Sequence, residues 1–492
     1  MEAKNTYRQI LKATSVFGGV QVFNVIVSII RSKLIAVWIG PVGIGIAGLL
    51  TATMNIIGGI SSLGIEMSAV KHISSHYREG EPDSVSVPVS ITRRIALYTG
   101  LFGAGLSLLC CHYLSVLTFG NDSHTWSFAW LSVTILLKQL TTGELAVLQS
   151  LRRIRSLARA NFYGNLIGLA LSAPLYFFFR IDAIVPAIII ASFLAMVFSF
   201  VYSRQIKISK AELERKDFFR EGKGILRMGI AMTFGSVLTL IASWAIQVYI
   251  SHDGGTAAVG LYNAGFTLLN SYVGLLFTAM GTDYFPRLSA LAEDKPRMHA
   301  AVREQSVIGI LIITPIIVFF LTFADTITEV LFARNFSAIV MMVSIGIVGM
   351  LFRTVSFSIG YMVLAKADTG LFVKNAIGFN VLYFALGIAG YHYYGLAGLG
   401  MAFTLHYFFH FVVLTLIAHV KYNFTFDGEF VRTYACCMVF SAAAFAFIFI
   451  EDEGLRLLLS VAIAILSAAF SLYRINLKTD LLSFITKLNQ PK

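Results

Sequence analysis

Long apolar segments, separated by short polar ones, run through the whole chain. A helix needs roughly 20 apolar residues to cross a bilayer. The pattern predicts an all-α polytopic membrane protein with about fourteen transmembrane helices. The expected spans cover approximately residues 12–38, 43–70, 91–114, 125–148, 158–179, 183–203, 228–250, 257–286, 304–325, 336–365, 370–392, 396–419, 433–450 and 455–473.

The composition agrees with a lipid environment. The chain has 492 residues, of which 57% are hydrophobic and 13% are charged. A soluble core of this size could not hide that much apolar surface, so part of the protein must face lipid. The longest polar stretch covers residues 207–224, and no loop is long enough to form a soluble catalytic domain.

A sequence pattern near the start of the chain returns in its second half. Residues 31–74 and the segment that begins near residue 257 share positions at one constant separation, the repeat interval: Gly45 with Gly260, Asn55 with Asn270, Gly59 with Gly274 and Ser74 with Ser289. Internal repeats of membrane helices commonly place a substrate site between the two halves. We therefore predict two pseudo-symmetric six-helix lobes around a central cleft, followed by two C-terminal helices. The expected limits are 1–206 for the first lobe, 207–224 for a cytoplasmic linker, 225–421 for the second lobe and 422–492 for the last two helices and a tail.

The distribution of basic residues predicts the orientation. Of the 38 Lys and Arg residues, 31 fall in one alternate set of loops and termini. By the positive-inside rule that set is cytoplasmic, so both termini are expected inside. The net charge of +12 is spread over these loops and forms no patch with interleaved exposed aromatic residues, which argues against a nucleic-acid partner.

Three of the cations within the predicted spans are the main candidates for substrate binding: Arg31, Lys138 and Arg353. Ionisable groups are costly at membrane depth and usually face a cavity or a partner. Lys138 is near the middle of the fourth span and Arg353 near the middle of the tenth. Cations that line a cleft would suit an anion such as a pyrophosphate. The alternatives are that Arg31 extends to the interface with Lys33, and that Lys138 forms a structural pair with Glu144 or another acid.

Acidic and amide side chains within the spans form a second group of candidates, for ion coupling or as polar groups of the cleft: Glu66, Glu144, Asp283, Gln247 and Asn270. An interfacial pair of Glu66 with Lys71 is an equal alternative to an ion site, and interhelical hydrogen bonding alone could explain the amides. His406 and His410 are four residues apart, a spacing seen at metal sites, but the sequence offers no third ligand. We expect no metal and no cofactor.

The residues at two places resemble a known family. The opening pattern has an arginine in the first span, then GPVGIGIAGLL, then a second span that ends in SLGIEMSAVKHISSHY; the basic segment LQSLRRIRSLARANFYGNLIG follows later. Both resemble the O-antigen flippases of the polysaccharide transporter family, within the multidrug, oligosaccharidyl-lipid and polysaccharide exporter superfamily. The resemblance extends over most of the chain.

The resemblance implies a function and partners. It implies two six-helix lobes around a central cleft and movement of undecaprenyl-pyrophosphate-linked oligosaccharide across the bacterial inner membrane by alternating access, driven by an ion gradient. Arg31, Lys138 and Arg353 would take the roles of the cleft cations, and a polysaccharide polymerase and a chain-length regulator are the expected protein partners. A cation-coupled multidrug exporter of the same superfamily is one alternative, although the cations within the spans argue against it. A membrane polymerase or ligase is the other, although it would need a larger outward loop with paired carboxylates or a histidine.

Overall fold

The computed structural model describes residues 23–77, 82–206, 208–209 and 215–479. Within these ranges the chain is helical and contains no strand. It divides into two compact units, which are residues 1–263 with 331–333, and residues 264–330 with 334–492. These findings confirm the predicted all-α class.

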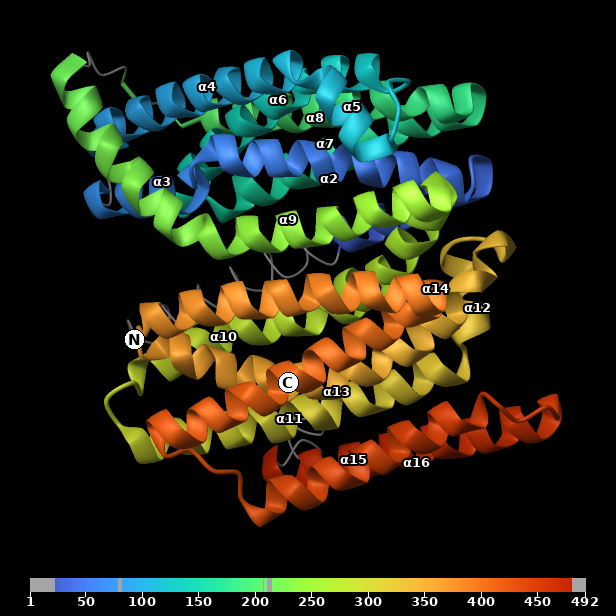
Figure 1. The fold of residues 1–492 in the computed structure, drawn as a ribbon. Helices are drawn as coiled ribbons and strands as arrows, with labels where there is room; N and C mark the ends of the chain where they lie inside the picture. Colours follow the sequence, from blue (N-terminus) through green and yellow to red (C-terminus); the bar gives the residue numbers. More distant parts are fainter. Residues whose placement is uncertain (1–22, 78–81, 207, 210–214, 480–492) are drawn as a thin grey trace, which may run out of the picture. The chain divides into compact units, whose positions relative to one another are not determined.

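The first unit begins with a helix that the structure describes over residues 23–38. Its other helices are coloured from blue to green in Figure 1, where α2, α4, α6, α7 and α8 lie roughly parallel to one another. They are α2 (Pro41–Ser62), α3 (Ile65–His76), η1 (Pro82–Val85), α4 (Ser86–Leu109), α5 (Cys111–Phe119), α6 (Thr125–Ser150), α7 (Ile154–Phe179), η2 (Arg180–Ala183), α8 (Ile184–Arg204) and α9 (Arg215–Thr267) up to Asn263.

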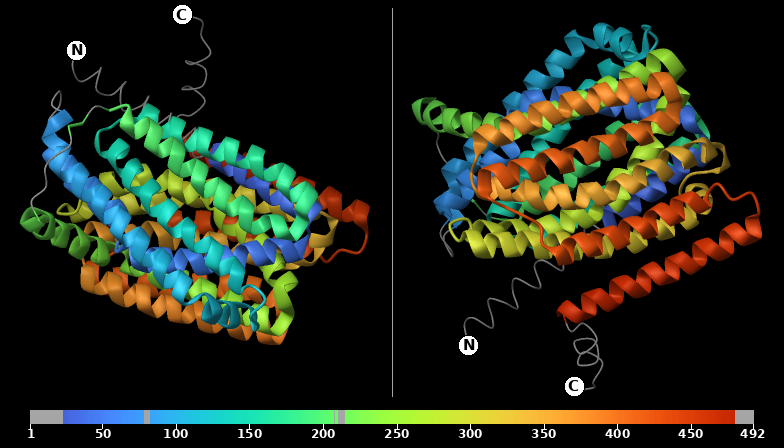
Figure 2. Two further views of the ribbon diagram at one scale, coloured as in Figure 1. Left: turned by 90° about the horizontal axis from the view of Figure 1, so that it is seen from above. Right: turned by 60° about the horizontal axis from the view of Figure 1, so that its bottom comes forward.

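The second unit contains a π-helical turn, η3 (Leu268–Val273), which leads into α10 (Leu275–Ala290). The remaining helices are α11 (Lys295–Thr322), α12 (Ala324–Leu331), η4 (Arg334–Ile339), α13 (Val340–Ala365), α14 (Thr369–Tyr422), α15 (Gly428–Phe447) and α16 (Glu453–Thr479). The last two, α15 and α16, pack against each other, as the right-hand view of Figure 2 shows, and α16 also packs against α11.

The internal repeat is visible in the helix boundaries. Moving α6 (Thr125–Ser150) along the chain by the repeat interval, which is the separation of Gly45 from Gly260, gives the bounds of α13 (Val340–Ala365). The same shift moves the start of α7 onto the start of α14. Since the helix boundaries and the matched residues of the sequence share one separation, the duplication predicted from the sequence is present in the backbone.

Unusual backbone angles repeat with the same spacing. Gly40 and Gly255 both have positive φ, at 85° and 75°, and each precedes a helix of the repeat. Arg180 and Gly395 form a second such pair, with φ of 53° and 57°. Gly255 and Gly395 are the points at which α9 and α14 break and change direction. Each of these two long elements is therefore a pair of helices.

The repeats contact each other closely within the first unit, and one of these helix crossings is reciprocal. A methyl group on Gly45 of α2 would lie 1.8 Å from the carbonyl oxygen of Thr256 in α9. A methyl group on Gly260 would lie 1.8 Å from the carbonyl oxygen of Pro41. Gly45 and Gly260 are separated by the repeat interval, and so are Pro41 and Thr256. The contact is thus reciprocal, as at a two-fold axis, and only glycine allows the two backbones to approach so closely.

The helix lengths agree with a membrane protein. Nine of the helices in the described ranges are long and apolar enough to cross a bilayer, or ten if α4 and α5 count as one bent span. Some of the nine are 39 to 54 residues long and exceed one crossing of about 30 Å of hydrocarbon. Membrane insertion of the chain is confirmed, whereas the number fourteen stays a prediction.

Two of the predicted spans are broken rather than continuous. In the second span, expected over 43–70, helix α2 ends at Ser62 and helix α3 begins at Ile65. Leu63 and Gly64 between them both have a left-handed backbone conformation. The third, expected over 91–114, bends by 66° where α4 meets α5 at Cys110. A left-handed residue cannot continue a right-handed helix, which explains the first break.

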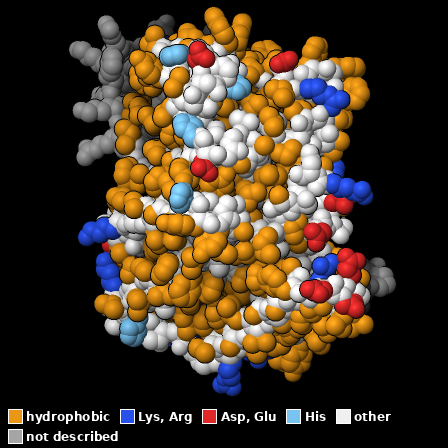
Figure 3. Space-filling model, turned by 45° about the vertical axis from the view of Figure 1, so that its right-hand side comes forward, with side chains coloured by type: hydrophobic (Ala, Val, Ile, Leu, Met, Phe, Trp, Pro, Cys, Tyr) orange, Lys and Arg blue, Asp and Glu red, His pale blue; other side chains and the backbone are white. Residues whose placement is uncertain are grey.

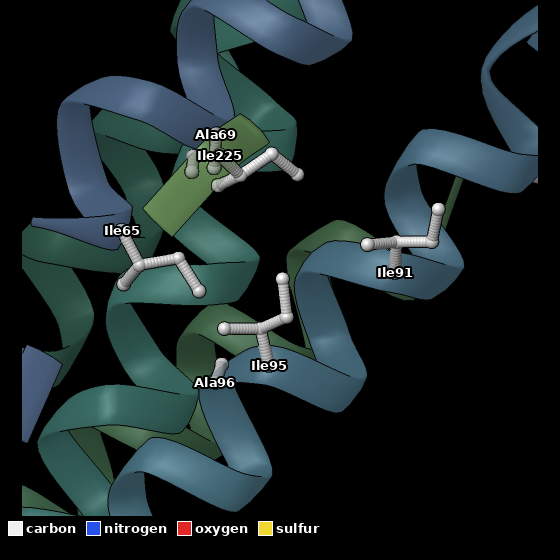
Figure 4. Packing of buried hydrophobic residues seen from close by; sticks show 7 residues of the cluster. Ile65, Ala69, Ile91, Ile95, Ala96 and Ile225 are labelled. Atoms are coloured by element: carbon white, nitrogen blue, oxygen red, sulfur yellow. The ribbon is translucent and has the colours of Figure 1, made fainter. Parts of the chain in front are cut away.

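Buried apolar residues hold the helices of each unit together. In the first unit, one cluster joins α3, α4, α6 and α9 through Ile65, Ala69, Ile91, Ile95, Ala96, Ala146 and Ile225 (Figure 4).

Hydrophobic side chains also cover most of the face in Figure 3. Large apolar groups such as Trp126 and Leu109 are 77% and 84% exposed. Such surfaces are stable against lipid but not against water.

The predicted domain limits stay a prediction. Helix α9 begins within the expected linker over 207–224, and its part up to Asn263 belongs to the first compact unit. The prediction had assigned residues 225–263 to the second lobe. By the repeat these residues do belong to the second half, because 238–263 correspond to 23–48. The compact unit and the repeat therefore have different boundaries.

Candidate functional site

Lys138 and Asn55 form a polar pair inside the first unit. Lys138 lies near the middle of α6, and its Nζ donates a hydrogen bond of 3.0 Å to Oδ1 of Asn55 on α2. The lysine side chain is exposed, and Asn55 is half-buried. The ammonium has three donors, and this bond uses one of them. The remaining donors are available to a ligand.

Arg353 and Asn270 form the corresponding pair in the second unit. Arg353 lies in the middle of α13, and its Nη1 donates a hydrogen bond of 2.8 Å to Oδ1 of Asn270 in η3. The guanidinium also lies 4.8 Å from the ring centre of Phe277 and 5.2 Å from that of Tyr407. Both aromatic rings attract the guanidinium electrostatically and so orient the Arg353 side chain.

The two pairs are copies of one another. Lys138 and Arg353 are separated by the repeat interval, and so are Asn55 and Asn270. Within each pair the cation follows its asparagine by 83 residues. The sequence pattern matched Asn55 with Asn270 and singled out both cations, but it did not join these observations. Each half therefore carries one candidate site, a cation paired with an asparagine, which equivalent helices place in the same way.

The chemistry of these pairs suits an anion. Each cation carries a full charge in the middle of a helix of 26 residues, where it would cost several kcal/mol without a partner. Neither asparagine neutralises that charge. Nδ2 of Asn270 is buried and has no hydrogen-bond partner among the described residues. Amide and guanidinium N–H groups are both donors that suit a phosphate oxygen, and the π-helical turn that holds Asn270 is a feature often found at functional sites.

The third predicted cation, Arg31, has a different environment. It lies on the helix over residues 23–38, and its side chain is half-buried. Its Nε is buried without a hydrogen-bond partner among the described residues, and the hydroxyl of Tyr176 is within electrostatic range. The repeat places Ile246 at the equivalent position of the second half. Arg31 therefore has no counterpart and is not part of the duplicated pair.

Glu144 is held in a charge cluster of its own. Its carboxylate accepts bonds of 2.9 and 2.8 Å from Arg93 of α4, and one of 2.5 Å from the hydroxyl of Ser203 on α8. Arg204 lies 4.0 Å away. Glu144 is 6% exposed. The alternative in which Glu144 pairs with Lys138 is wrong, because Glu144 forms its ion pair with Arg93, and Lys138 donates its hydrogen bond to Asn55.

The other predicted polar residues are scattered. Gln247 on α9 is buried, and its Nε2 donates to the carbonyl oxygen of Ser243 at 3.4 Å, while its Oε1 has no partner in the described part of the chain. Glu66 is exposed in the first turn of α3. Asp283 belongs to α10, and its side chain is outside the described residues. Among the members of this group whose side chains are described, only Asn270 contacts one of the predicted cations.

The two histidines of α14 do not form a metal site with other ligands. No group of three or more His, Cys, Asp or Glu residues is close enough to hold a metal ion within the described ranges. The ring centres of His406 and His410 are 6.0 Å apart, and Phe379 and Tyr383 pack against them from the other arm of α14.

Several residues around the candidate site were missed at the sequence level. They are the partners of the predicted residues: Asn55, Phe277, Tyr407, Arg93 and Ser203. Only Asn55 carried a detectable signal, because its spacing to Lys138 equals the spacing of Asn270 to Arg353. Aromatic residues are too frequent in this sequence to single out Phe277 and Tyr407 without coordinates.

Comparison with known proteins adds a family and a fold. A sequence model of the family described as "Polysaccharide biosynthesis protein" matches residues 34–341, more than half of the chain. A comparison with curated protein sequences found no match.

Several solved structures share the fold. A structure described as "Lipid II flippase MurJ, inward closed conformation" has a TM-score of 0.69 at 15% identity, over 96% of this chain and 100% of that one. An inward-facing multidrug resistance MATE family transporter of the MOP superfamily has a TM-score of 0.70 at 13% identity, over 82% and 94% of the two chains. A MOP superfamily transporter from Pyrococcus furiosus has a TM-score of 0.61 at 13% identity, over 84% and 96%. At these identities the likeness establishes the fold alone.

Proposed function

The chain belongs to the polysaccharide biosynthesis protein family, and from that premise we propose that it is a flippase. Its substrate would be an undecaprenyl-pyrophosphate-linked oligosaccharide, such as an O-antigen repeat unit. The protein would move the headgroup from the cytoplasmic to the periplasmic leaflet of the bacterial inner membrane by alternating access, driven by an ion gradient. The family and the fold support the resemblance to flippases inferred from the sequence.

One observation carries this proposal, namely the duplicated pair of a cation and an asparagine. A transporter for cationic drugs would place acids rather than cations at mid-membrane, because like charges repel. A diphosphate needs positive charge and hydrogen-bond donors, and each pair by itself provides both. Lys138 offers a point charge with free donors, while Arg353 offers a planar fork that fits two phosphate oxygens.

Energetics explain why only the headgroup needs a protein site. A charged, sugar-bearing group cannot enter hydrocarbon without a large desolvation penalty. The polyprenyl tail is already in its preferred solvent and can stay in lipid during transfer. The protein therefore has to compensate the diphosphate charge and the sugar hydroxyls, which is a task for a few polar residues rather than for a large apolar pocket.

The proposed setting follows from the same premise. We expect both termini in the cytoplasm, and a polysaccharide polymerase and a chain-length regulator as functional partners. The reaction is transport, and the proposal includes no covalent step. A polymerase or ligase would instead join glycans without moving them.

Translocation by the purified protein tests the proposal. The full chain is reconstituted in vesicles with an undecaprenyl-pyrophosphate-linked oligosaccharide, and the fraction of glycan that becomes accessible to an enzyme on the opposite side is followed over time. We expect Lys138→Ala and Arg353→Ala each to slow transfer by at least tenfold. The control is Arg94→Ala, which removes an exposed cation of α4.

The outcomes separate the candidate functions. Transfer at the wild-type rate in both cation variants would refute the role of the two pairs. Glycan joined without transfer would favour a polymerase or ligase. Export of a cationic drug, with no transfer of the lipid-linked glycan, would favour the multidrug exporter.

A further inference from the structure

In each repeat, two antiparallel helices follow the helix that carries the cation, and the contact between these two helices differs between the repeats. In the first half these are α7 and α8, which meet through small residues. A methyl group on Gly164 would lie 3.2 Å from Cα of Ala195, and one on Gly168 would lie 3.5 Å from Cα of Ala191. Small residues at these points allow the backbones to approach closely.

The second half replaces this small-residue contact by aromatic and histidine side chains. One repeat interval later, the positions equivalent to Gly164 and Ala195 are Phe379 and His410, and the centres of these two rings are 4.2 Å apart. The positions equivalent to Gly168 and Ala191 are Tyr383 and His406, and the centres of these two rings are 5.3 Å apart. The contacts are the same in both halves, but the second half has gained two imidazoles that the duplicated fold does not require.

These imidazoles have unused hydrogen-bonding capacity. His406 is 8% exposed, and His410 is half-buried. Nδ1 of each ring is buried and has no hydrogen-bond partner among the described residues. A buried polar atom without a partner is costly, so it usually indicates a bound species or a change of state. A proton is the smallest such species, and it needs no further ligands.

Among the described residues, the surroundings of the two imidazoles contain one fixed charge. Arg353 of α13 is within electrostatic range of both histidines. The other titratable groups that face them are Tyr383 from the first arm of α14 and Tyr407 from the second arm. In the described part of the chain no carboxylate acts on either imidazole. A sodium ion or other metal cation would meet repulsion from Arg353 and would find too few oxygen ligands.

We propose that His406 and His410 form a proton-binding site that compensates charge while the headgroup is bound, and that binding of an anion at Arg353 drives their proton uptake. The inference rests on the proposed function, because it requires the diphosphate to engage Arg353. Without an anion, the guanidinium opposes a second positive charge in its neighbourhood. A bound diphosphate compensates the guanidinium charge, and one proton then enters the histidine pair. Binding of proton and substrate are thus mutually favourable.

Calorimetry on the intact protein measures this linkage directly. The full chain is placed in nanodiscs and titrated with undecaprenyl diphosphate in buffers of different ionisation enthalpy, which gives the number of protons taken up per lipid bound. The diphosphate exchanges protons itself, so the difference between protein variants is the relevant quantity. We expect the wild type to take up about one proton more per lipid than His406→Gln/His410→Gln. When the pH is lowered from 7.5 to 6.5, the affinity of the wild type for the lipid should rise by up to about tenfold more than that of the double variant.

Matched variants keep the result interpretable. His392→Gln changes an exposed histidine of the same helix and should behave as the wild type. The single variants His406→Gln and His410→Gln cover the case in which the double variant fails to fold. A proton count equal to that of the wild type in every folded variant, with binding still dependent on Arg353, would overturn the proton site alone. Undecaprenyl diphosphate bound equally well by Arg353→Gln would overturn the proposed function as well.

Discussion

The buried cluster around Glu144 offers a quantitative test of what holds the first unit together. Removing Arg93 leaves the carboxylate of Glu144, a residue that is 6% exposed, with the Ser203 hydroxyl and a distant Arg204 as its partners in the described part of the chain. Breaking a buried ion pair by removing one partner costs about 3–5 kcal/mol. The Arg93 side chain is 22% exposed and two partners of Glu144 remain, so we expect Arg93→Ala to lower the free energy of unfolding by about 2–4 kcal/mol.

The matched double variant separates stability from ion coupling. Replacing both charges by apolar groups, as in Arg93→Met/Glu144→Leu, removes the desolvation penalty together with the attraction and is often nearly neutral. We therefore expect it to recover most of the stability lost in Arg93→Ala.

Denaturant unfolding in detergent measures the stability of both variants, and the vesicle assay measures their transport. Normal transport by a stable Arg93→Met/Glu144→Leu protein would exclude Glu144 as an ion-coupling group. A double variant less stable than Arg93→Ala would refute the reasoning.

Three further predictions concern the backbone and the surface. Gly45→Ala and Gly260→Ala should each destabilise the protein by about 1–3 kcal/mol and by similar amounts, because they occupy equivalent places in a reciprocal contact; a large difference in unfolding free energy between them would contradict the symmetry. Gly395→Ala should cost about 1–3 kcal/mol through its φ of 57° alone, since nothing lies within 4 Å of the added methyl group; an unchanged unfolding free energy would refute this. The Lys421 ammonium, which donates a hydrogen bond to Asp368, holds the pKa of that carboxyl below its usual value. The folded state therefore gains stability above the unfolded pKa and loses it as the pH falls through the lower folded pKa. Asp368→Asn keeps the helix cap and should lower Tm at pH 7 by about 2 °C or less, with no difference from wild type below the folded pKa; a difference that persists there would contradict the role of charge.

Much of the fold could be predicted because hydrophobic length and repetition are strong signals. Apolar runs of membrane length indicated helices, and the match of Gly45 with Gly260 indicated a duplication that the backbone confirms. Breaks within spans were not predicted, because Gly64 is one of 40 glycines in the chain and does not stand out, while Cys110 carries no turn signal. Their conformations depend on neighbouring helices.

The candidate site was only partly visible in the sequence. A single charge such as Lys138 stands out in an apolar run, so the cations were found. Their partners depend on which helix faces which, and that information is absent from local periodicity. For this reason Glu144, six residues from Lys138, was considered as its partner, although the helices direct it to Arg93.

The duplicated pairs are the central claim, and affinity for a charged lipid relative to a neutral one tests them most directly. We propose to measure binding of undecaprenyl diphosphate and of undecaprenol to the wild type and to Lys138→Gln/Arg353→Gln in nanodiscs. The wild type should bind the diphosphate lipid at least tenfold more tightly than the alcohol, and the double variant should lose this preference while binding undecaprenol equally well. An unchanged preference in the folded double variant would show that the diphosphate is recognised elsewhere.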